Sequence, residues 1–424
     1  MGRTGFEETV FEALTDDTSA PAGLTPEAQG AEAGSFLRHV ASLSMTKLAD
    51  GLLSPKLVLS WLLTHLGAGS ILVGLLVPIR ESLALLPQLF TAPRLQAMAR
   101  RKWAWAIGSA VQGGACAGIV AVALTLQGNA AGVAICALLA VLALARSICS
   151  VTYKDVLGKT VGAARRGSAT GFAASFASFG VIVFAAILVL WNETRLGLVL
   201  GALAVAAGLW LGAALVFAGL REAPEPGRNE GTPWGQLRLL RQDRGLARFI
   251  VVRGLLTSTA LAPPYLILLG PEDGAFSRLG ALLLASAAAS FLSSYVWGRF
   301  ADRSSRRVLA ASGGIGAVAL AGAPILVGAG FAGTWWGLPS VLFLLMIAYH
   351  GVRQGRSTYL VDMAPEDRRS AYTAVSNTVI GVVLMGSGVF GAVASMAGAS
   401  VTLWLFAMMS GAAAWVALGL KEVE

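Results

Sequence analysis

Long apolar segments recur along this chain and constrain its fold more than any other feature. A helix needs about 20 apolar residues to cross a bilayer, whereas transmembrane β-barrel strands appear as alternating segments of about ten residues. The continuous runs here predict an all-α membrane protein with about twelve transmembrane helices. Their approximate limits are 41–64, 69–90, 103–125, 129–152, 168–191, 196–219, 247–269, 277–299, 308–330, 337–361, 371–397 and 400–420.

The composition agrees with a membrane protein. The chain is 56% hydrophobic and only 13% charged, whereas soluble domains average about 25% charged residues, and its mean hydropathy is +0.70. The three cysteines lie inside apolar segments and the three histidines are scattered, so neither set has the spacing of a metal site or a disulfide framework. We expect no cofactor. The sequence shows no nucleophile–base spacing of the kind that would indicate an enzyme.

Basic residues gather in alternate loops between the apolar segments. In the opposite loops, the only Lys or Arg residues are Arg195 and Arg278. Because cytoplasmic loops carry an excess of Lys and Arg, we expect both termini in the cytoplasm and the chain in the cell (inner) membrane. The same rule accounts for the net charge of +9, which therefore indicates no nucleic-acid partner.

One long polar loop divides the chain into two halves. We expect a disordered cytoplasmic tail over 1–35, an N-terminal six-helix bundle over 36–220, a cytoplasmic linker loop over 221–246 and a C-terminal six-helix bundle over 247–424. At an offset of about 203 residues, Arg165-Arg166 falls on Arg368-Arg369 and Lys47 falls near Arg253. Repeated halves are typical of secondary transporters, whose binding sites lie at the repeat interface near the bilayer midplane.

A charged motif follows the eighth apolar segment. It reads Gly298-Arg-Phe-Ala-Asp302-Arg303-Ser-Ser-Arg306-Arg307 and resembles the G-x-x-x-D-[RK]-x-G-[RK]-[RK] loop of the major facilitator superfamily, with serine at position 305 in place of the later glycine. The resemblance implies two pseudo-symmetric six-helix bundles and a cytoplasmic latch of the outward-facing state that includes Asp302. The plainer alternative is a basic turn. The corresponding loop of the first half, TAPRLQAMARRKWAW, lacks the Gly and Asp, so we expect its latch to be altered or absent.

The first two apolar segments carry five charged residues, namely Lys47, Asp50, Lys56, Arg80 and Glu81. A charge in a membrane span costs about 2.5–3.5 kcal/mol on insertion scales, so these side chains should face a protein interior or a wet cavity. Lys47 and Asp50 are three residues apart and can pair on one helix face. Lys56 either snorkels or finds a partner on another span, and Pro55 is expected to kink the first span.

Arg80 and Glu81 are the strongest candidates for a functional role. Adjacent helical residues point in different directions, so each side chain needs a partner from another helix. The candidate partners are Arg146, Arg253 and Arg353. A desolvated carboxyl group can hold a proton, so Glu81 is a candidate for a coupling proton, with a structural salt bridge as the alternative.

Polar residues elsewhere complete the predicted sites. The candidates for substrate binding or coupling are Lys47, Asp50, Arg80, Glu81, Gln88, Arg146, Arg253, His350, Arg353 and Asn377. The candidates for gating are Gly298, Asp302, Arg303, Arg306, Arg307, Lys154, Asp155, Arg356 and Asp362. Cations outnumber acids in the first group, which favours an anionic or zwitterionic small solute.

These features predict a secondary active transporter that moves such a solute across the cell membrane by alternating access. A proton, carried by Glu81 or Asp50, is a candidate coupling ion. We expect the chain to act as a monomer in the lipid bilayer. The alternative is a transporter-like membrane sensor or assembly partner without transport activity.

Overall fold

The computed structural model describes residues 5, 8–9, 11–12, 25–88, 91, 94–95, 97–162, 165–190, 195–224, 238–269, 275–301, 303–365 and 369–423. Their first half forms α2 (Pro26–Gln29), α3 (Glu32–Leu53), the π-helix η1 (Pro55–Leu59), α4 (Ser60–His65), α5 (Ser70–Leu85), α7 (Lys102–Thr125), α8 (Gly128–Thr160), α9 (Arg166–Leu190) and α10 (Arg195–Ala218). Their second half forms α11 (Leu239–Gln242), α12 (Arg244–Leu255), α13 (Thr257–Leu261), α14 (Pro263–Leu268), α15 (Ala275–Ala301), α16 (Ser305–Gly328), the 3₁₀-helix η5 (Phe331–Gly333), α17 (Gly337–Met363), α18 (Arg369–Gly386), α19 (Val389–Ala397) and α20 (Ala399–Leu418). None of the described residues lies in a β-strand, and the predicted all-α class is confirmed.

Twelve passes run through these helices, as the apolar segments predict. The first (α3–α4), the seventh (α12–α14) and the eleventh (α18–α19) are broken helices, and each remaining pass is a single helix. Within the described residues, eight passes are long and apolar enough to cross a membrane by length and composition. The passes that fall short include α3–α4, α5 and α17, which carry most of the charged residues of the predicted substrate site.

The first pass breaks where the sequence predicts a kink. Pro55 has no backbone N–H, so the regular helical ladder cannot continue through it. Ser54 adopts φ 20° and ψ 91°, and its carbonyl oxygen accepts from the N–H groups of Leu57, Val58 and Leu59 at 2.8–3.2 Å. The break ends α3 at Leu53 and starts η1 at Pro55.

Helix α3 begins within the segment that we expected to be a disordered tail. Pro26–Gln29 is helical and Glu32 starts α3. Glu32 is buried because it contacts the second half of the same bundle: its Oε2 lies 2.8 Å from Nη1 of Arg165, and its Oε1 accepts from the N–H of Gly162 at 2.9 Å. This polar anchor extends the first helix well before residue 41.

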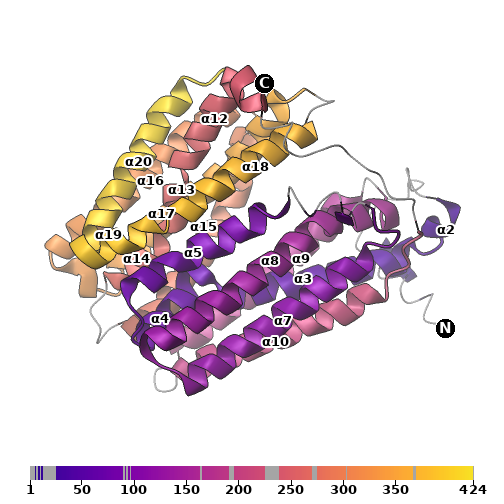
Figure 1. Ribbon diagram of the computed structural model, residues 1–424, viewed down its shortest axis with the longest axis horizontal. Coiled ribbons are helices and arrows are strands. Elements are labelled where there is room, and N and C mark those ends of the chain that lie inside the picture. The colour runs from indigo at the N-terminus through magenta and orange to yellow at the C-terminus, as the bar shows by residue number, and fades with distance from the viewer. Residues whose placement is uncertain are drawn as a thin grey trace.

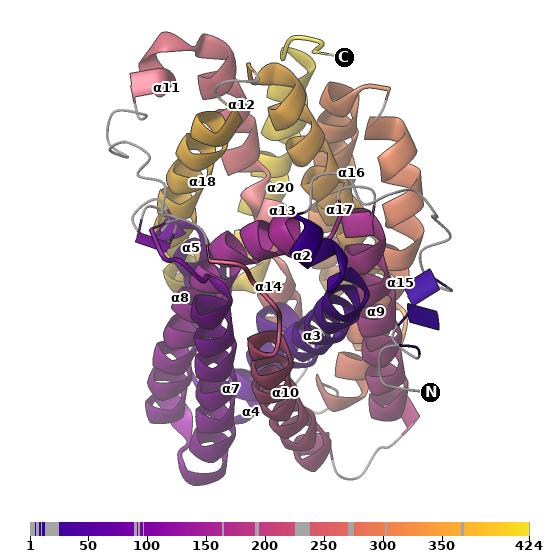
Figure 2. The same cartoon turned by 90° about the vertical axis from the view of Figure 1, so that its right-hand side faces the viewer.

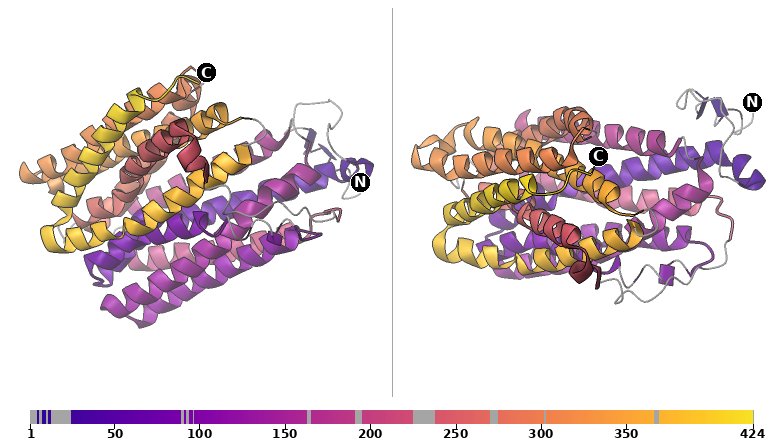
Figure 3. Two further views of the ribbon diagram at one scale, coloured as in Figure 1. Left: turned by 45° about the horizontal axis from the view of Figure 1, so that its top comes forward. Right: turned by 90° about the horizontal axis from the view of Figure 1, so that it is seen from above.

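The passes pack as two six-helix bundles, coloured indigo to pink and red to yellow in Figure 1. Within the first bundle α3 packs on α9 and α10, and α7 on α8 and α10; within the second, α16 packs on α17 and α20. The bundles meet along α5 with α18 and α19, and along α9 with α15. The left panel of Figure 3 shows the two colour groups side by side, whereas in Figure 2 the first bundle lies largely in front of the second.

The bundle ends differ in how tightly they close. We call the end with α2 and the C-terminus the terminal end, and the opposite end, with α4, α14 and α19, the distal end (Figure 1). At the distal end η1 and α4 pack on α14, and α5 packs on α19. Among the described residues, the long helices α8 and α17, one from each bundle, are not among the closely packed helix pairs.

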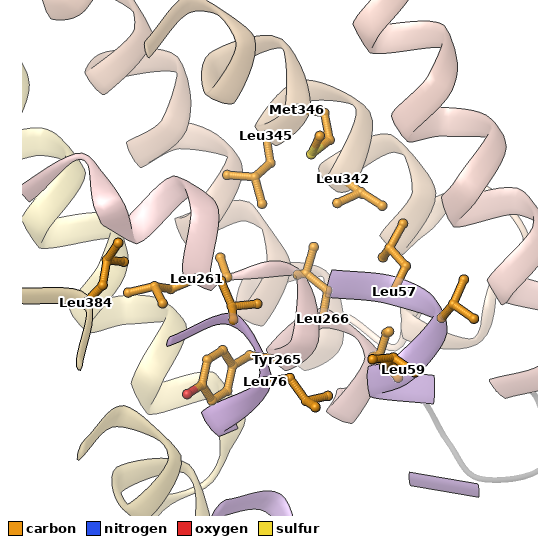
Figure 4. Close-up of a cluster of buried hydrophobic side chains, with 14 of the residues drawn as sticks. Leu57, Leu59, Leu76, Leu261, Tyr265, Leu266, Leu342, Leu345, Met346 and Leu384 are labelled. Atoms are coloured by element: carbon orange, nitrogen blue, oxygen red, sulfur yellow. The ribbon is translucent and has the colours of Figure 1, made fainter. Parts of the chain in front are cut away.

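Apolar side chains from both bundles fill the distal half. Figure 4 shows Leu57, Leu59 and Leu76 of the first bundle among a larger group from the second, which is Leu261, Tyr265, Leu266, Leu342, Leu345, Met346 and Leu384. Close backbone contact supports this closure, because a Cβ atom on Gly74 would lie 2.7 Å from both Cα of Gly391 and Oη of Tyr265. Glycines allow helices to approach this closely.

Candidate functional site

Asp50 lies at the centre of an ion-pair triad in the first bundle. Its Oδ1 lies 2.6 Å from Nη2 of Arg80, and its Oδ2 accepts from Nη1 of Arg146. The three side chains come from α3, α5 and α8. Arg80 is buried, whereas 38% of the Arg146 side chain is exposed. One carboxylate faces two guanidinium groups, so the triad retains an excess positive charge.

The predicted pairing of Lys47 with Asp50 is wrong. Lys47 Nζ instead donates to the carbonyl oxygen of Thr170 on α9 at 3.2 Å. Both oxygens of Asp50 are already occupied by arginines from other helices, and the planar guanidinium fits a carboxylate better than an ammonium does. Lys47 nonetheless lies within electrostatic range of Asp50, Arg146 and Arg353.

Glu81 has charged neighbours but no direct ion pair. Among the described residues, no basic group lies within 4.0 Å of the Glu81 carboxylate. Lys56, Arg80, Arg356 and Arg146 nonetheless interact with this carboxylate electrostatically. Protein surrounds Glu81, yet part of its side chain is accessible to solvent. Glu81 is therefore partly exposed rather than fully buried.

Lys56 has an aromatic partner in the second bundle. Its Nζ lies 3.6 Å from the ring centroid of Tyr349 on α17, which is a cation–π contact. Of the two alternatives for Lys56, a partner on another span is therefore the one observed. Tyr349 is also partly solvent-accessible inside the protein, and it was not among the predicted site residues.

Arg253 occupies a buried site in the second bundle. Its Nη1 donates to Oγ of Ser376 at 2.6 Å and its Nη2 to Oδ1 of Asn377 at 2.9 Å. Its Nε is buried and has no hydrogen-bond partner among the described residues. The positive charge of Arg356 interacts electrostatically with that of Arg253. Among the described residues, the hydrogen-bond acceptors of this guanidinium are thus both neutral.

Helix α17 presents a row of basic and polar groups at helical spacing. His350, Arg353 and Arg356 are three residues apart, which places them along one side of the helix. His350 Nε2 is buried without a hydrogen-bond partner in the described part of the chain, whereas Arg353 is exposed. Gln88 differs from these candidates, because its Nε2 donates to the carbonyl oxygen of Ala84, near the end of α5, at 2.7 Å.

In the second bundle, the charged loop before α16 is tied to the C-terminal segment. Oγ of Ser304 accepts from the N–H of Arg307 at 3.3 Å, which caps α16, and the same hydroxyl donates to Glu422. Arg306 Nη2 lies 2.5 Å from Oε2 of Glu422. Arg303 and the Arg307 side chain are exposed, while Asp302 and the surroundings of Gly298 lie outside the described residues.

The first bundle has its own polar network at the same end. Arg101 pairs with Asp155 of α8. Glu222, which follows α10, accepts from the N–H groups of Arg101 and Lys102 at 3.1 and 2.8 Å, and lies 3.6 Å from Nζ of Lys159. At this end of the first bundle, these contacts form a polar network whose residues differ from those of the family's loop motif.

Two further gating candidates lie at the edge of these networks. Lys154 is exposed beside Asp155, where the two line a pocket of about 290 Å³ with Arg101 and Thr152. Asp362 is exposed near the end of α17.

The sequence matches the Major Facilitator Superfamily over residues 41–383. That span covers most of the chain, from within the first pass to within the eleventh. The chain belongs to the major facilitator superfamily. It is a multi-pass membrane protein of a transporter family. No curated protein matches it significantly.

Solved structures of superfamily transporters share its fold. The nucleoside transporter NupG (D323A mutant) is 15% identical with a TM-score of 0.69, covering 91% of this chain and 100% of that chain. The xylose transporter XylE from E. coli, in an inward open conformation, is 11% identical with a TM-score of 0.65, covering 92% and 96%. A POT family transporter in complex with a thioalcohol conjugated peptide is 9% identical with a TM-score of 0.69, covering 91% and 95%. At these identities the likeness shows the fold alone.

The superfamily fold explains two residues that sequence reasoning missed. Glu222 and Glu422 each follow the last helix of a bundle and contact the start of that bundle's third helix, α7 or α16. They are 200 residues apart, close to the offset between the two halves. Comparing the ends of the two repeats would have found this pair.

Proposed function

We propose that the protein is a secondary transporter that moves a small anionic or zwitterionic solute across the cell membrane by alternating access. One observation carries the proposal: cations exceed acids in the central region between the bundles. The acids are Asp50 and Glu81. Seven cations form ion pairs or interact electrostatically with these acids or with each other. They are Lys47, Lys56, Arg80, Arg146, Arg253, Arg353 and Arg356.

Such an excess has an energetic consequence. Cations inside a membrane protein are costly unless they are paired or hydrated. Asp50 offsets part of the charge of Arg80 and Arg146, but Arg253 contacts only a hydroxyl and an amide. A solute with an anionic group would lower the electrostatic energy of this region, whereas a cationic solute would raise it.

The arrangement of the bundles supports alternating access. The distal half is filled by apolar side chains (Figure 4), whereas α8 and α17, one from each bundle, are not among the closely packed helix pairs of the described residues. If the basic loops and both termini face the cytoplasm, as the charge asymmetry predicts, this is an inward-facing state. We further propose that the networks around Glu222 and Glu422 hold each bundle rigid at its terminal end during rocking.

We also propose that Glu81, rather than Asp50, carries a coupling proton. Both oxygens of Asp50 are engaged by arginines, so a proton there would disrupt the triad. Glu81 has no direct ion pair among the described residues and is accessible to solvent. A proton can therefore reach it without breaking a structural contact.

Uptake into proteoliposomes tests the transport proposal. Purified protein is screened for thermal stabilisation by acidic, zwitterionic, neutral and basic metabolites, and the stabilising solutes are then assayed for uptake across an imposed pH gradient. We expect acidic or zwitterionic solutes to accumulate, and Glu81→Gln to abolish accumulation against a gradient while downhill exchange persists. Accumulation of only basic solutes would overturn the anionic assignment, and pH-driven accumulation by Glu81→Gln would remove Glu81 from the coupling role.

A further inference from the structure

Arg253 differs from the other buried arginine of the central region in how its charge is balanced. Arg80 is in direct contact with Asp50 at 2.6 Å. Arg253 is 6% exposed, and no carboxylate among the described residues lies within salt-bridge distance of it. Both arginines are buried to a similar degree. Among the described residues they therefore differ in the presence of a counter-charge and not in burial.

The contacts of Arg253 leave donors unused. A guanidinium has five N–H donors in a planar fork, and Arg253 uses one on Ser376 and one on Asn377. Its Nε remains buried without a partner among the described residues. A buried polar group of this kind is destabilising when it has no hydrogen-bond partner, and more so when it is charged.

The local backbone favours a site rather than a packing defect. Ser376 and Asn377 lie on α18, and Arg253 lies on α12 just before the helix is interrupted between α12 and α13. The side chain of Asn377 is only partly buried, so the polar group beside the guanidinium is open to solvent on one side. Arg356, also partly accessible, adds a second positive charge within electrostatic range.

We propose that Arg253, Ser376 and Asn377 form the subsite for the solute's oxyanion, a carboxylate or phosphate group, with Arg356 as the second cation. The inference rests on the proposed transport of an anionic solute and places its charged group on the second bundle. The Asp50 triad of the first bundle is internally paired and does not bind this group. On binding, the oxyanion takes up unused N–H donors of Arg253, and small side-chain shifts bring it to the guanidinium fork.

The hydrogen-bonding pattern predicts that oxyanion binding requires the guanidinium group of Arg253 and not merely a positive charge. Arginine presents a planar fork to an oxyanion, whereas lysine presents a compact ammonium that cannot hold Ser376, Asn377 and a ligand in the same geometry. Arg253→Lys should therefore keep the charge but lose most of the affinity. Arg248→Gln is a matched control, because Arg248 lies on the same helix but is exposed and donates to Gly419 at the terminal end.

Thermal stabilisation of the purified full chain by sodium acetate, sodium succinate and sodium phosphate, against sodium chloride at equal ionic strength, tests the subsite. We expect at least one of these oxyanions to stabilise the wild type and Arg248→Gln alike, with the acetate, succinate and phosphate arms separating carboxylate from phosphate. Arg253→Gln and Arg253→Lys should need at least tenfold more of that anion than the wild type or Arg248→Gln. Unchanged anion dependence in Arg253→Gln, or no response of the wild type to any oxyanion, overturns the subsite.

The outcomes separate this inference from the proposed function. If Arg146→Gln loses the anion response and Arg253→Gln keeps it, the solute is still anionic but binds on the first bundle, and only the subsite fails. If wild-type protein is stabilised solely by neutral or basic solutes in the wider screen, the proposed function fails and the subsite with it. Circular dichroism of each variant establishes that the fold is intact before the comparison.

Discussion

Nη2 of Arg80 on α5 lies 2.6 Å from Oδ1 of Asp50 on α3, and the pair joins the first two passes at a point where the side chains are 10% and 20% exposed. Removing one partner of a buried pair leaves the other charge uncompensated, which costs about 3–5 kcal/mol. We therefore expect Asp50→Ala to lower the free energy of unfolding in detergent by about 3 kcal/mol. A double-mutant cycle with Arg80→Ala measures the coupling, and additive losses in the cycle would contradict a direct interaction.

Glu222 and Glu422 allow a comparison between pseudo-symmetric positions. The Glu222 side chain is 0% exposed and accepts from two backbone N–H groups, whereas the Glu422 side chain is 40% exposed. Hydrogen bonds to charged groups contribute about 1.5–3 kcal/mol each, while exposed ion pairs contribute about 0–1 kcal/mol. Glu222→Ala should therefore lower the melting temperature several times more than Glu422→Ala; equal losses would argue against the burial-based explanation.

Gly74 tests the distal closure. An added methyl group would lie 2.7 Å from Cα of Gly391 in the other bundle, so Gly74→Ala should disfavour the closed distal end and shift the population toward other states. The readout is maleimide labelling of Leu266→Cys, in a background where Cys116, Cys136 and Cys149 are replaced by alanine. We expect faster labelling in Gly74→Ala. Gly114→Ala, which meets nothing within 4 Å, is the control and should label at the parental rate.

Asp243 predicts a pH-dependent contribution to stability at the start of α12. Partial burial opposes its charged form, but the hydroxyl of Tyr372 and the N–H groups of Leu246 and Gly245 outweigh this and hold the pKa of Asp243 below its ordinary value of 3.8. A lowered folded-state pKa contributes stability above the unfolded-state pKa, and this contribution is lost as the pH falls through the folded-state value. Asp243→Asn should thus destabilise the protein at pH 7, with the difference from wild type shrinking below about pH 3.8. The same difference in stability at pH 7 and below about pH 3.8 would contradict a lowered pKa of Asp243.

The passes could be predicted from the sequence because each depends on a local property, the length of an apolar run. The kink at Pro55 is equally local, since it follows from the missing N–H group. The partner of Arg80 could not be predicted in this way. Asp50 is 30 residues away, and the local rule that paired it with Lys47 ignored the arginines that other helices bring to both of its oxygens.

The same reason explains the other gaps. Tyr349 looked like an ordinary residue of an apolar span until the fold placed Lys56 over its ring. Arg253 was recognised as a candidate, but the sequence could not show that its partners are neutral. Charges in membrane spans can be located from sequence, whereas their pairing depends on how helices from both halves pack.

Entrance counterflow in proteoliposomes tests the central claim most directly. Vesicles are loaded with an unlabelled acidic solute identified by thermal stabilisation, and the uptake of external labelled solute is followed without any ion gradient. We predict a transient accumulation of label, and none when the acidic group of the solute is replaced by a neutral amide. Equal counterflow of the amide analogue, or no counterflow of any stabilising solute, would contradict a transporter with a cationic central site.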